Sequence, residues 1–357
     1  MTTSTYPFIT PEFLEALEKS QSADVASGWQ PVHLELNDED KTWFMPLYLK
    51  DHSMGEYVFD YSWANAYHQH GLDYYPKLVT AVPFTPSSGE RLRGPSGLHS
   101  KHGTRIIDQI ELIAEQTQAS SWHLLFPNSG QREAFDDSRL LTREGVQYHW
   151  FNNNYQSFDD YLAVMTYRKR KMISKERARV RAQDINVKIL LGAEIDGEIW
   201  ALFYQLYERT YAKRNGSRGY LTESFFDLIS HNLREQIAMA VAYINDQPIA
   251  CALYFFDHNT LYGRYWGSID EFQYLHFELC YYSGIEFAIQ QGLQRYDAGA
   301  QGEHKLVRGF EPVKTYSLHW IKHEQFRDAI RRFTKSEKKA VGDHIRQAKT
   351  LLPFKQQ

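Results

Sequence analysis

The residues best suited to chemistry gather in one glycine-rich stretch, residues 298–305, which reads AGAQGEHK and follows an expected strand. Glycines let a ligand approach the backbone closely, and main-chain N–H groups in such a loop bind anions or developing oxyanions. The carboxylate of Glu303 and the imidazole of His304 are candidate general bases. A loop of ordinary solvated charges is the alternative, but this composition at a strand exit favours a functional site. The residues of this loop expected to bind a ligand are Gln301, Gly302, Lys305 and Arg308.

A second polar and aromatic group lies upstream, in GRYWG at residues 263–267 and at His276 and Glu278. Arg264 and Trp266 are two residues apart on an expected strand, so they share one face, either as a stacked structural pair or as a cleft wall. His276 and Glu278 open an expected helix and do not face each other, so only one should point into a cleft. Glu278 is the third candidate base, and a plain surface position is the alternative for His276. The expected binding residues of this group are Arg264, Tyr265, Trp266 and His276.

A third group lies in residues 147–152, QYHWFN, on another expected strand. On a strand, His149 faces the opposite way from Trp150 and Asn152. A core strand with one satisfied histidine is a serious alternative to a cleft wall. We include all three residues among the candidate binding residues.

A fourth feature is the basic run at residues 168–181, which holds eight bases and one acid, Glu176. No single face of a helix can hold all eight bases, so most of them should be solvated. Solvation is the usual fate of such a run. The alternative is that some of them bind phosphates of RNA or of a nucleotide-containing cofactor.

The elements that must position these groups are clearest in the second half of the chain. Three antiparallel strands come first, then a helix over 275–291 and a strand over 295–298. The glycine-rich loop follows, then a strand over 315–321 and a basic amphipathic helix over 325–352. This order resembles an acyltransferase domain of the GNAT type, although a fold pattern alone does not fix a function.

A short internal match indicates that the chain is duplicated. An expected helix ends in Gly-Leu at 71–72 and at 292–293, and each is followed by a strand. After the strand comes a loop that opens with Gly-Glu and closes with Arg-Gly after a leucine, GERLRG at 89–94 and GEHKLVRG at 302–309. We therefore expect an α/β (α+β) protein with tandem GNAT-like domains, each a mixed, mainly antiparallel sheet flanked by helices. The expected divisions are an N-terminal domain over 1–156, a long basic linking helix over 157–184 and a C-terminal domain over 185–357 that carries the active site.

Composition limits the classes of protein that fit. The 357 residues include 43% hydrophobic residues and a net charge of −4, which suits a two-domain globular protein better than a generic nucleic-acid binder. Cys251 and Cys280 lie in apolar segments without metal-ligand spacing, so we expect reduced core residues. No run approaches the roughly 18 apolar residues of a membrane span, and the first residues do not form a secretory signal. We expect a cytoplasmic protein.

Several motifs are absent from the sequence. It contains no GxxxxGK[ST], HExxH, GxSxG or strand-linked GxGxxG pattern, which argues against a P-loop kinase, a zincin, an α/β-hydrolase and a Rossmann dehydrogenase. We expect no metal and no DNA partner. A clear pyrophosphate loop of the kind Gln/Arg-x-x-Gly-x-Gly is also missing, so acyl-CoA has no direct support.

Most of the chain, from Trp43 to Trp320, resembles a bacterial family of predicted N-acyltransferases, the FemAB-like peptidoglycan biosynthesis/recognition family of the GNAT superfamily. The motifs are long and specific. The segments that carry the resemblance are MPLYLKDHSMGEYVFDYSWANAY, YYPKLVTAVPFTP, SSWHLLFP, QYHWFNNNYQSFDDYLAVMTYRKRK, LYGRYWGS, LHFELCYYSGIEFAI and DAGAQGEHKLVRGFEPV.

The resemblance implies two tandem GNAT-like domains and transfer of an acyl or aminoacyl group to an amine. Relatives named for Fem use aminoacyl-tRNA as donor and a peptidoglycan precursor as acceptor, whereas others in the superfamily use acyl-CoA, so the donor stays open. Our first hypothesis is direct attack, with Glu303, His304 or Glu278 as base and backbone near Gly302 holding the donor carbonyl. The alternatives are a non-catalytic module that recognises a cell-wall precursor and a tRNA-dependent enzyme that modifies protein N-termini.

Overall fold

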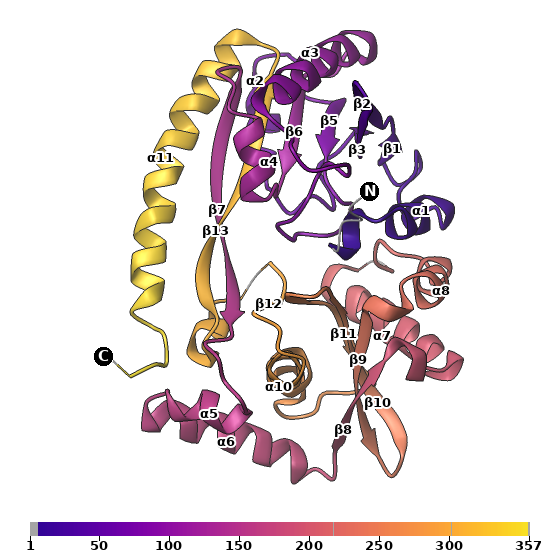
Figure 1. Ribbon diagram of the computed structural model, residues 1–357, viewed down its shortest axis with the longest axis vertical. Coiled ribbons are helices and arrows are strands. Elements are labelled where there is room, and N and C mark those ends of the chain that lie inside the picture. The colour runs from indigo at the N-terminus through magenta and orange to yellow at the C-terminus, as the bar shows by residue number, and fades with distance from the viewer. Residues whose placement is uncertain (1–5, 217, 301, 356–357) are drawn as a thin grey trace. The chain divides into compact units, whose positions relative to one another are not determined.

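The computed structural model describes residues 6–216, 218–300 and 302–355, and it divides into two compact units. Unit 1 contains Met1–Val146 and Lys314–His344, and unit 2 contains Gln147–Val313 and Ile345–Gln357. Each unit is a β-sheet with helices packed on it, and Figure 1 labels the elements. This mixed α/β architecture confirms the expected fold class. No helix in the described ranges is long and apolar enough to cross a membrane.

Unit 1 consists of three antiparallel strands followed by one parallel strand pair, and two further strands form a small sheet of their own. Its strands are β1 (Gln30–Pro31), β2 (Leu34–Asp38), β3 (Lys41–Met45), β4 (Tyr48–Lys50), β5 (Lys77–Thr80), β6 (Ser121–Leu125) and parts of β7 (Leu140–Phe151) and β13 (Glu311–Ile321). Its helices are α1 (Pro11–Lys19), α2 (Tyr61–Gln69), α3 (Ser100–Thr117), α4 (Ser129–Ala134) and most of α11 (Glu324–Lys349). β1, β4 and β5 pair antiparallel, β5 and β6 pair parallel, and β6 pairs antiparallel with β13.

The core of unit 1 forms where α3 covers the sheet. Ile106, Ile110 and Ala114 recur every four residues, so they lie on one face of α3 and are fully buried. They pack in one cluster with Trp122 and Leu124 of β6. Burying an isoleucine of this kind contributes roughly 1.5–3 kcal/mol, which fixes α3 as the crossover between the parallel strands.

Unit 2 repeats this plan with a longer meander. Its strands are β8 (Asn186–Leu191), β9 (Ile237–Ile244), β10 (Gln247–Phe256), β11 (Thr260–Ser268) and β12 (Arg295–Asp297), with the end of β7. Its helices are α5 (Phe158–Ala163), α6 (Tyr167–Arg181), α7 (Gly197–Asn215), α8 (Glu223–Asn232), α9 (Leu275–Phe277) and α10 (Ser283–Gln290). β8 to β11 form an antiparallel meander, β11 and β12 pair parallel, and β12 pairs antiparallel with β7.

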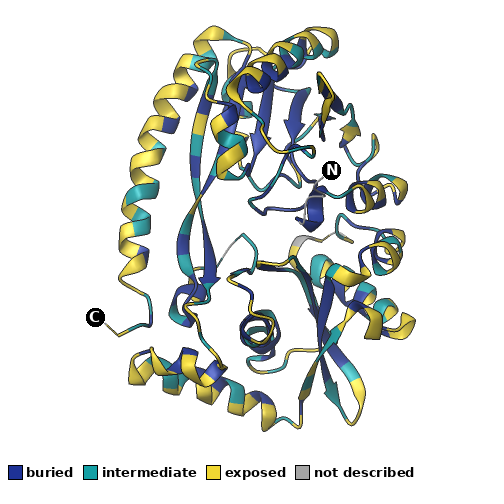
Figure 2. Cartoon of the chain, viewed as in Figure 1, coloured by how far each residue is buried: buried dark blue, intermediate teal, exposed yellow. Residues whose placement is uncertain are grey.

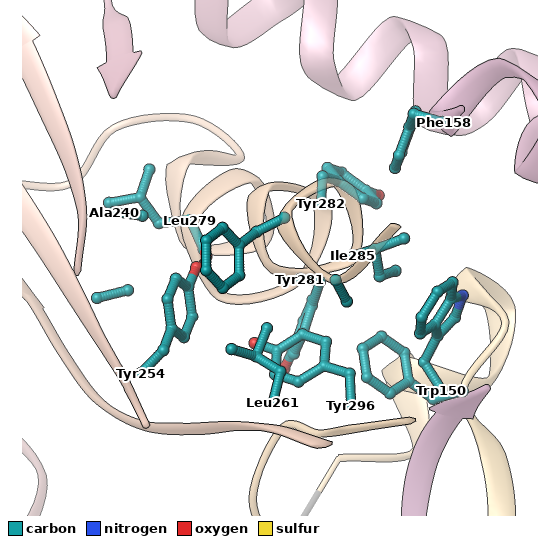
Figure 3. Packing of buried hydrophobic residues seen from close by; sticks show 14 of the residues in the cluster. Trp150, Phe158, Ala240, Tyr254, Leu261, Leu279, Tyr281, Tyr282, Ile285 and Tyr296 are labelled. Atoms are coloured by element: carbon teal, nitrogen blue, oxygen red, sulfur yellow. The ribbon is translucent and has the colours of Figure 1, made fainter. Parts of the chain in front are cut away.

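The crossover from β11 to β12 is a single helical path whose middle is a π-helical turn, Glu278–Tyr282, between α9 and α10. Its buried side packs on the sheet through Leu279 and Ile285, which Figure 3 shows beside Tyr254 and Tyr296. The hydroxyl of Tyr254 donates to the carbonyl of Leu279 in the π turn. Single π turns often mark functional sites. Figure 2 shows that the strands are mostly buried, whereas the outer faces of the helices are exposed.

The structure corrects the expected linking helix. The expected helix is two helices, α5 and α6, interrupted at Met165 and Thr166. Met165 forms a β-bridge with Phe354, and the Thr166 N–H donates to the carbonyl of Pro353, so pairing with the chain end breaks the helix. Both helices belong to unit 2 and do not link the units.

The compact units also differ from the expected divisions at 1–156, 157–184 and 185–357. Residues 314–344 follow the second half in sequence but belong to unit 1, because β13 pairs with β6. Long-range strand pairing of this kind leaves no local signal in the sequence.

The two glycine loops matched in the sequence occupy different places in the fold. The 89–94 loop follows β5, which is the first strand of the parallel pair in unit 1. The 302–309 loop follows β12, which is the second strand of the pair in unit 2. The duplication therefore exists at the level of strand order, with β6 and not β5 as the counterpart of β12.

Candidate active site

The 298–309 loop, which follows β12, is held by a buried ammonium group. Lys305 is 1% exposed, and its Nζ donates to the carbonyls of Ala298 (2.8 Å) and Gly299 (2.7 Å). Burial lowers the pKa of Lys305 to about 8, although Asp297 acts in the opposite direction. At neutral pH the side chain is therefore a cation held against main-chain carbonyls, and one of its three N–H groups remains beyond these two bonds.

His304 is the exposed imidazole of this loop. Its Nε2 lies 2.7 Å from the hydroxyl of Tyr281, and its ring is 5.8 Å from that of Phe277. Partial burial and the positive charges of Arg308 and Lys305 lower the pKa of His304. Its ring is therefore neutral at pH 7, which is the form that accepts a proton.

Arg308 holds the loop in place. The side chain is buried, and Nη2 lies 2.9 Å from both carboxylate oxygens of Glu176. Nε donates to the hydroxyl of Tyr282 (2.8 Å), and Nη1 donates to the carbonyl of His304 (2.9 Å). The guanidinium also lies 3.6 Å from the ring centre of Phe277. Every guanidinium nitrogen already has a partner within the unit, so the expected role in binding a donor phosphate has no support from this geometry.

Glu278 joins the π turn to α6. It is 5% exposed, and Arg177 donates to its Oε1 from Nε (3.0 Å) and Nη2 (2.9 Å). The same Nη2 reaches Glu286 at 2.7 Å. Burial raises the pKa of Glu278, and Arg177 opposes that rise. A buried carboxylate in a bidentate pair is placed for structure, and the geometry favours His304 over Glu278 as base.

Asp297, the last residue of β12, anchors the start of the loop. It is 1% exposed, and its Oδ1 accepts the N–H of Gly299 at 2.9 Å. Arg264 lies 3.4 Å from Oδ2 and His149 lies 3.8 Å from Oδ1. Burial alone would raise the pKa of Asp297, but Arg264 and His149 hold it well below its usual range. Burial in turn lowers the pKa of His149 to about 4.

Trp266 and Tyr265 of β11 point to opposite sides of the sheet, and the register between β10 and β11 shifts at Arg264. The ring of Trp266 contacts that of His276 edge-on, with 4.7 Å between ring centres. Burial lowers the pKa of His276 to about 3. Tyr265 points the other way and packs on Tyr207 of α7 and Phe226 of α8, 5.3 and 6.1 Å between ring centres. Trp266 and His276 therefore lie beside the loop residues, whereas Tyr265 does not.

Two residues expected to line a cleft, Trp150 and Asn152, lie in the core and in a turn. Trp150 is fully buried, with its ring 5.8 Å from Tyr161, and Figure 3 shows it in the core cluster. Asn152 closes a turn, because its Oδ1 accepts the N–H of Tyr155 (2.8 Å) and its Nδ2 donates to the carbonyl of Leu293 (3.2 Å).

The remaining loop residues are Gln301, Gly302 and Glu303. Gln301 lies outside the described residues. Gly302 has a φ of 119°, and a Cβ there would lie 2.6 Å from the ring of His304, so glycine is required for the imidazole to sit where it does. Glu303 is exposed at the first position of the 3₁₀ helix Glu303–Arg308.

The sequence alone did not point to four residues of this site, which are Asp297, Tyr281, Tyr282 and Glu176. Asp297 carried a usable signal, since it is a carboxylate at a strand end directly before glycines. Glu176 carried one too, as the single acid in the basic run. The tyrosines carried none, because an aromatic residue on an amphipathic helix is usually core.

The arrangement combines a neutral imidazole with a neighbouring buried ammonium at the exit of a parallel strand pair. An imidazole in this state can take a proton from an amine, and an ammonium can stabilise a developing oxyanion. No group of three or more His, Cys, Asp and Glu side chains in the described residues is arranged to hold a metal ion.

The sequence matches the model of the FemAB-like family, described as peptidoglycan biosynthesis/recognition, over residues 1–356. No curated protein matches it. Among solved structures, FemX is similar at 12% identity and a TM-score of 0.54, covering 93% of this chain and 99% of that chain. The L-PGS of Bacillus licheniformis is similar at 12% identity and a TM-score of 0.53, covering 91% and 96%.

A conserved protein of unknown function from Bacteroides thetaiotaomicron is similar at 13% identity and a TM-score of 0.51, covering 87% of this chain and 90% of that chain. At such identities the likeness establishes a shared fold. The family match is of a different kind, because it spans almost the whole chain. On that basis the protein belongs to the FemAB-like family.

Proposed function

We propose that this protein transfers an acyl or aminoacyl group from an activated donor to an amine, with the 298–309 loop as the place of reaction. The observation that carries the proposal is that His304 and Lys305 are consecutive residues with complementary protonation states. A neutral, exposed imidazole stands next in sequence to a buried ammonium whose pKa is about 8. These are the base and the oxyanion partner that such a transfer needs.

In the proposed reaction the acceptor amine attacks the carbonyl carbon of the donor, and a C–N bond forms. When Nε2–H of His304 donates to the oxygen of Tyr281, Nδ1 is the ring nitrogen that accepts the amine proton. Lys305 stabilises the negative charge on the carbonyl oxygen. The C–O bond of an ester or the C–S bond of a thioester then breaks, and the leaving oxygen or sulfur takes up the proton.

Helix α6 supports an aminoacyl-tRNA donor over acyl-CoA. Of its bases, only Arg177 points into the unit, toward Glu278 and Glu286. In the described part of the chain, none of the others forms an ion pair with a carboxylate. A cationic helix of this kind attracts the phosphates of a polynucleotide by counterion release. The other bases are Arg168, Lys169, Arg170, Lys171, Lys175, Arg179 and Arg181.

The family description supports a peptidoglycan precursor as the source of the acceptor amine. The similarity to FemX agrees in fold. We therefore propose the amine of a peptidoglycan precursor as acceptor. Recognition of that precursor without catalysis is the competing function, and it differs in predicting binding without transfer.

The experiment measures the melting temperature of the protein with acyl-CoAs, free CoA, and charged or uncharged tRNA. A ligand at 100 times its dissociation constant stabilises the folded state by about 2.7 kcal/mol. We expect a shift with tRNA that weakens steeply with salt, and none with CoA species. Lys171→Glu together with Lys175→Glu should reduce the tRNA shift, while Arg209→Glu on the exposed side of α7 serves as the matched control.

Turnover with the donor so identified then tests the loop. His304→Ala should lower kcat by about 10²-fold while leaving the melting temperature close to that of the native protein. Glu303→Gln tests the neighbouring carboxylate in the same assay. Unchanged rates in both variants would remove the loop from the mechanism, and binding without any transfer would favour the recognition function.

A further inference from the structure

Unit 2 contains a second feature that acyl transfer does not use, a cavity of about 340 Å³ between α7 and α8. A cavity of this size is large enough for a small ligand. Its lining comes from residues 192–234 and shares no residue with the 298–309 loop or the groups around it. It therefore needs its own explanation.

One wall of the cavity is aromatic. Trp200 and Tyr204 are four residues apart, so they lie one turn apart on the same face of α7, and both are half-buried. Phe226 of α8 is buried, and its ring lies 5.9 Å from that of Tyr204. Half-buried aromatic faces of this kind hold apolar groups and attract cations.

The opposite wall carries two carboxylates. Glu223 and Asp227 are four residues apart on α8, so they lie on one face of it near its N-terminal end. Among the described residues neither forms an ion pair with a lysine or arginine, and Nδ1 of His231 lies 3.9 Å from Oδ1 of Asp227. Burial raises the pKa of the Tyr204 phenol, and the carboxylates of Glu208 and Glu223 raise it further. Carboxylates beside aromatic rings suit an ammonium group.

A guanidinium group lines the cavity past the end of α8. Arg234 is two residues beyond Asn232, the last residue of the helix. Nη2 of Arg234 donates to the carbonyl of Ala193 at 3.1 Å, which orients the guanidinium and leaves other N–H donors. The part of α8 from Asp227 to Asn232 rises about 7.5 Å, and Arg234 lies beyond it. An extended tripeptide, roughly 10 Å long, has a comparable length.

We propose that this cavity binds a short peptide with a free α-amino group and a free carboxylate. The ammonium group lies at Glu223 and Asp227, the carboxylate lies at Arg234, and the peptide runs along Trp200 and Tyr204. The proposal concerns binding and does not depend on the proposed acyl transfer, so either can fail without the other.

The test is a ligand-observed NMR titration of the full chain, which suits weak binding. The probes are trialanine, N-acetyltrialanine and trialanine amide, which differ only in whether each end is charged. Trialanine should bind one site per chain, and blocking either end should weaken binding by up to about fivefold, the upper range for one exposed ion pair. Equal binding of all three peptides, or no binding of trialanine at millimolar concentration, would overturn the proposal.

Variants assign the ends. Asp227→Asn should bring the affinity for trialanine down to that for N-acetyltrialanine, and Arg234→Gln should remove the difference between trialanine and its amide. Trp200→Ala should weaken all three peptides alike. Glu198→Gln, on α7 but outside the cavity, is the matched control and should change nothing. If Asp227→Asn and Arg234→Gln fold as the native protein does and bind all three peptides as before, the cavity is not the site.

Discussion

Unit 1 buries Lys50 and Lys77 almost completely, and unit 2 buries Lys305. Burial lowers the pKa of Lys50 to about 7, whereas Lys77 and Lys305 differ in charge balance. In unit 1, Lys77 is fully buried and donates to Ser53 (2.7 Å), Glu56 (2.8 Å) and Asp60. Burial acts to lower the pKa of Lys77, but the two carboxylates outweigh it and the pKa rises. In unit 2, Lys305 donates to two main-chain carbonyls, and its pKa falls to about 8. Burial therefore leaves a locked ion pair at Lys77 and a cation with a lowered pKa at Lys305.

The ends of the parallel strand pairs differ in the same sense. At the end of β6 in unit 1, Arg91 is fully buried and donates to the carbonyls of Leu125 (2.6 Å), Ser87 (2.5 Å) and Glu90 (2.8 Å). At the end of β12 in unit 2, an exposed imidazole follows instead. At this strand end Arg91 holds the backbone of unit 1, whereas unit 2 exposes His304, which supports unit 2 as the place of the proposed reaction.

The largest expected effect concerns Lys77. Lys77→Met leaves Glu56 and Asp60 buried without their shared cation, and should lower the free energy of unfolding by about 3–5 kcal/mol. Urea denaturation measures this change, with Lys41→Met at an exposed position as control. A decrease in the free energy of unfolding below about 1 kcal/mol would contradict a strong buried ion pair between Lys77 and the two carboxylates.

For Lys305 we expect a large loss of activity and a smaller loss of stability. Lys305→Met should lower kcat by about 10²–10³-fold, the size seen when one oxyanion donor is removed. It should cost less stability than Lys77→Met, because Asp297 keeps Arg264 as a partner. Steady-state kinetics and denaturation of both variants, measured side by side, test the contrast. A Lys305→Met variant with native activity would contradict the proposed difference between the two lysines.

A smaller effect is expected at Glu176, which positions Arg308 and through it the carbonyl of His304. Glu176→Gln should lower kcat about tenfold through misplacement of the loop, with little change in the affinity for the donor. The dissociation constant for the donor is measured by titration and kcat by turnover. Equal kcat in the variant and the native protein would mean that the clamp serves stability alone.

The smallest expected effects are changes in kcat/KM with pH. His304 must be neutral, so kcat/KM should rise with pH through a pKa below its ordinary value near 6.5. Lys305 must be charged, so the rate should fall again through about 8. Lys305→Arg should move only the upper limb to higher pH, because a guanidinium stays protonated there. An unchanged upper limb in that variant would assign it to another group.

Local pattern predicted the elements more accurately than the roles of individual charges. Periodicity found α11 to within a few residues, but the strand alternation expected at Arg264 and Trp266 is interrupted by a shift in the β10–β11 register at Arg264. It could not show that Arg308 is occupied by Glu176, a residue 132 positions away. Glu278 and Arg177 are likewise 101 positions apart. Whether a charge is free or paired depends on such partners, and spacing along the chain does not encode them.

The sequence by itself determined the family, the two-part α/β architecture and the loop that holds Glu303, His304 and Lys305, because glycines, strand ends and amphipathic faces are local properties of the chain. Tertiary structure decided the rest. Pairing of β13 with β6 moved residues 314–344 into unit 1, and pairing of Met165 with Phe354 broke the expected linking helix. Burial, with or without a carboxylate in reach, set the pKa values of the lysines, since the cost of burying a charge depends on what the fold places around it.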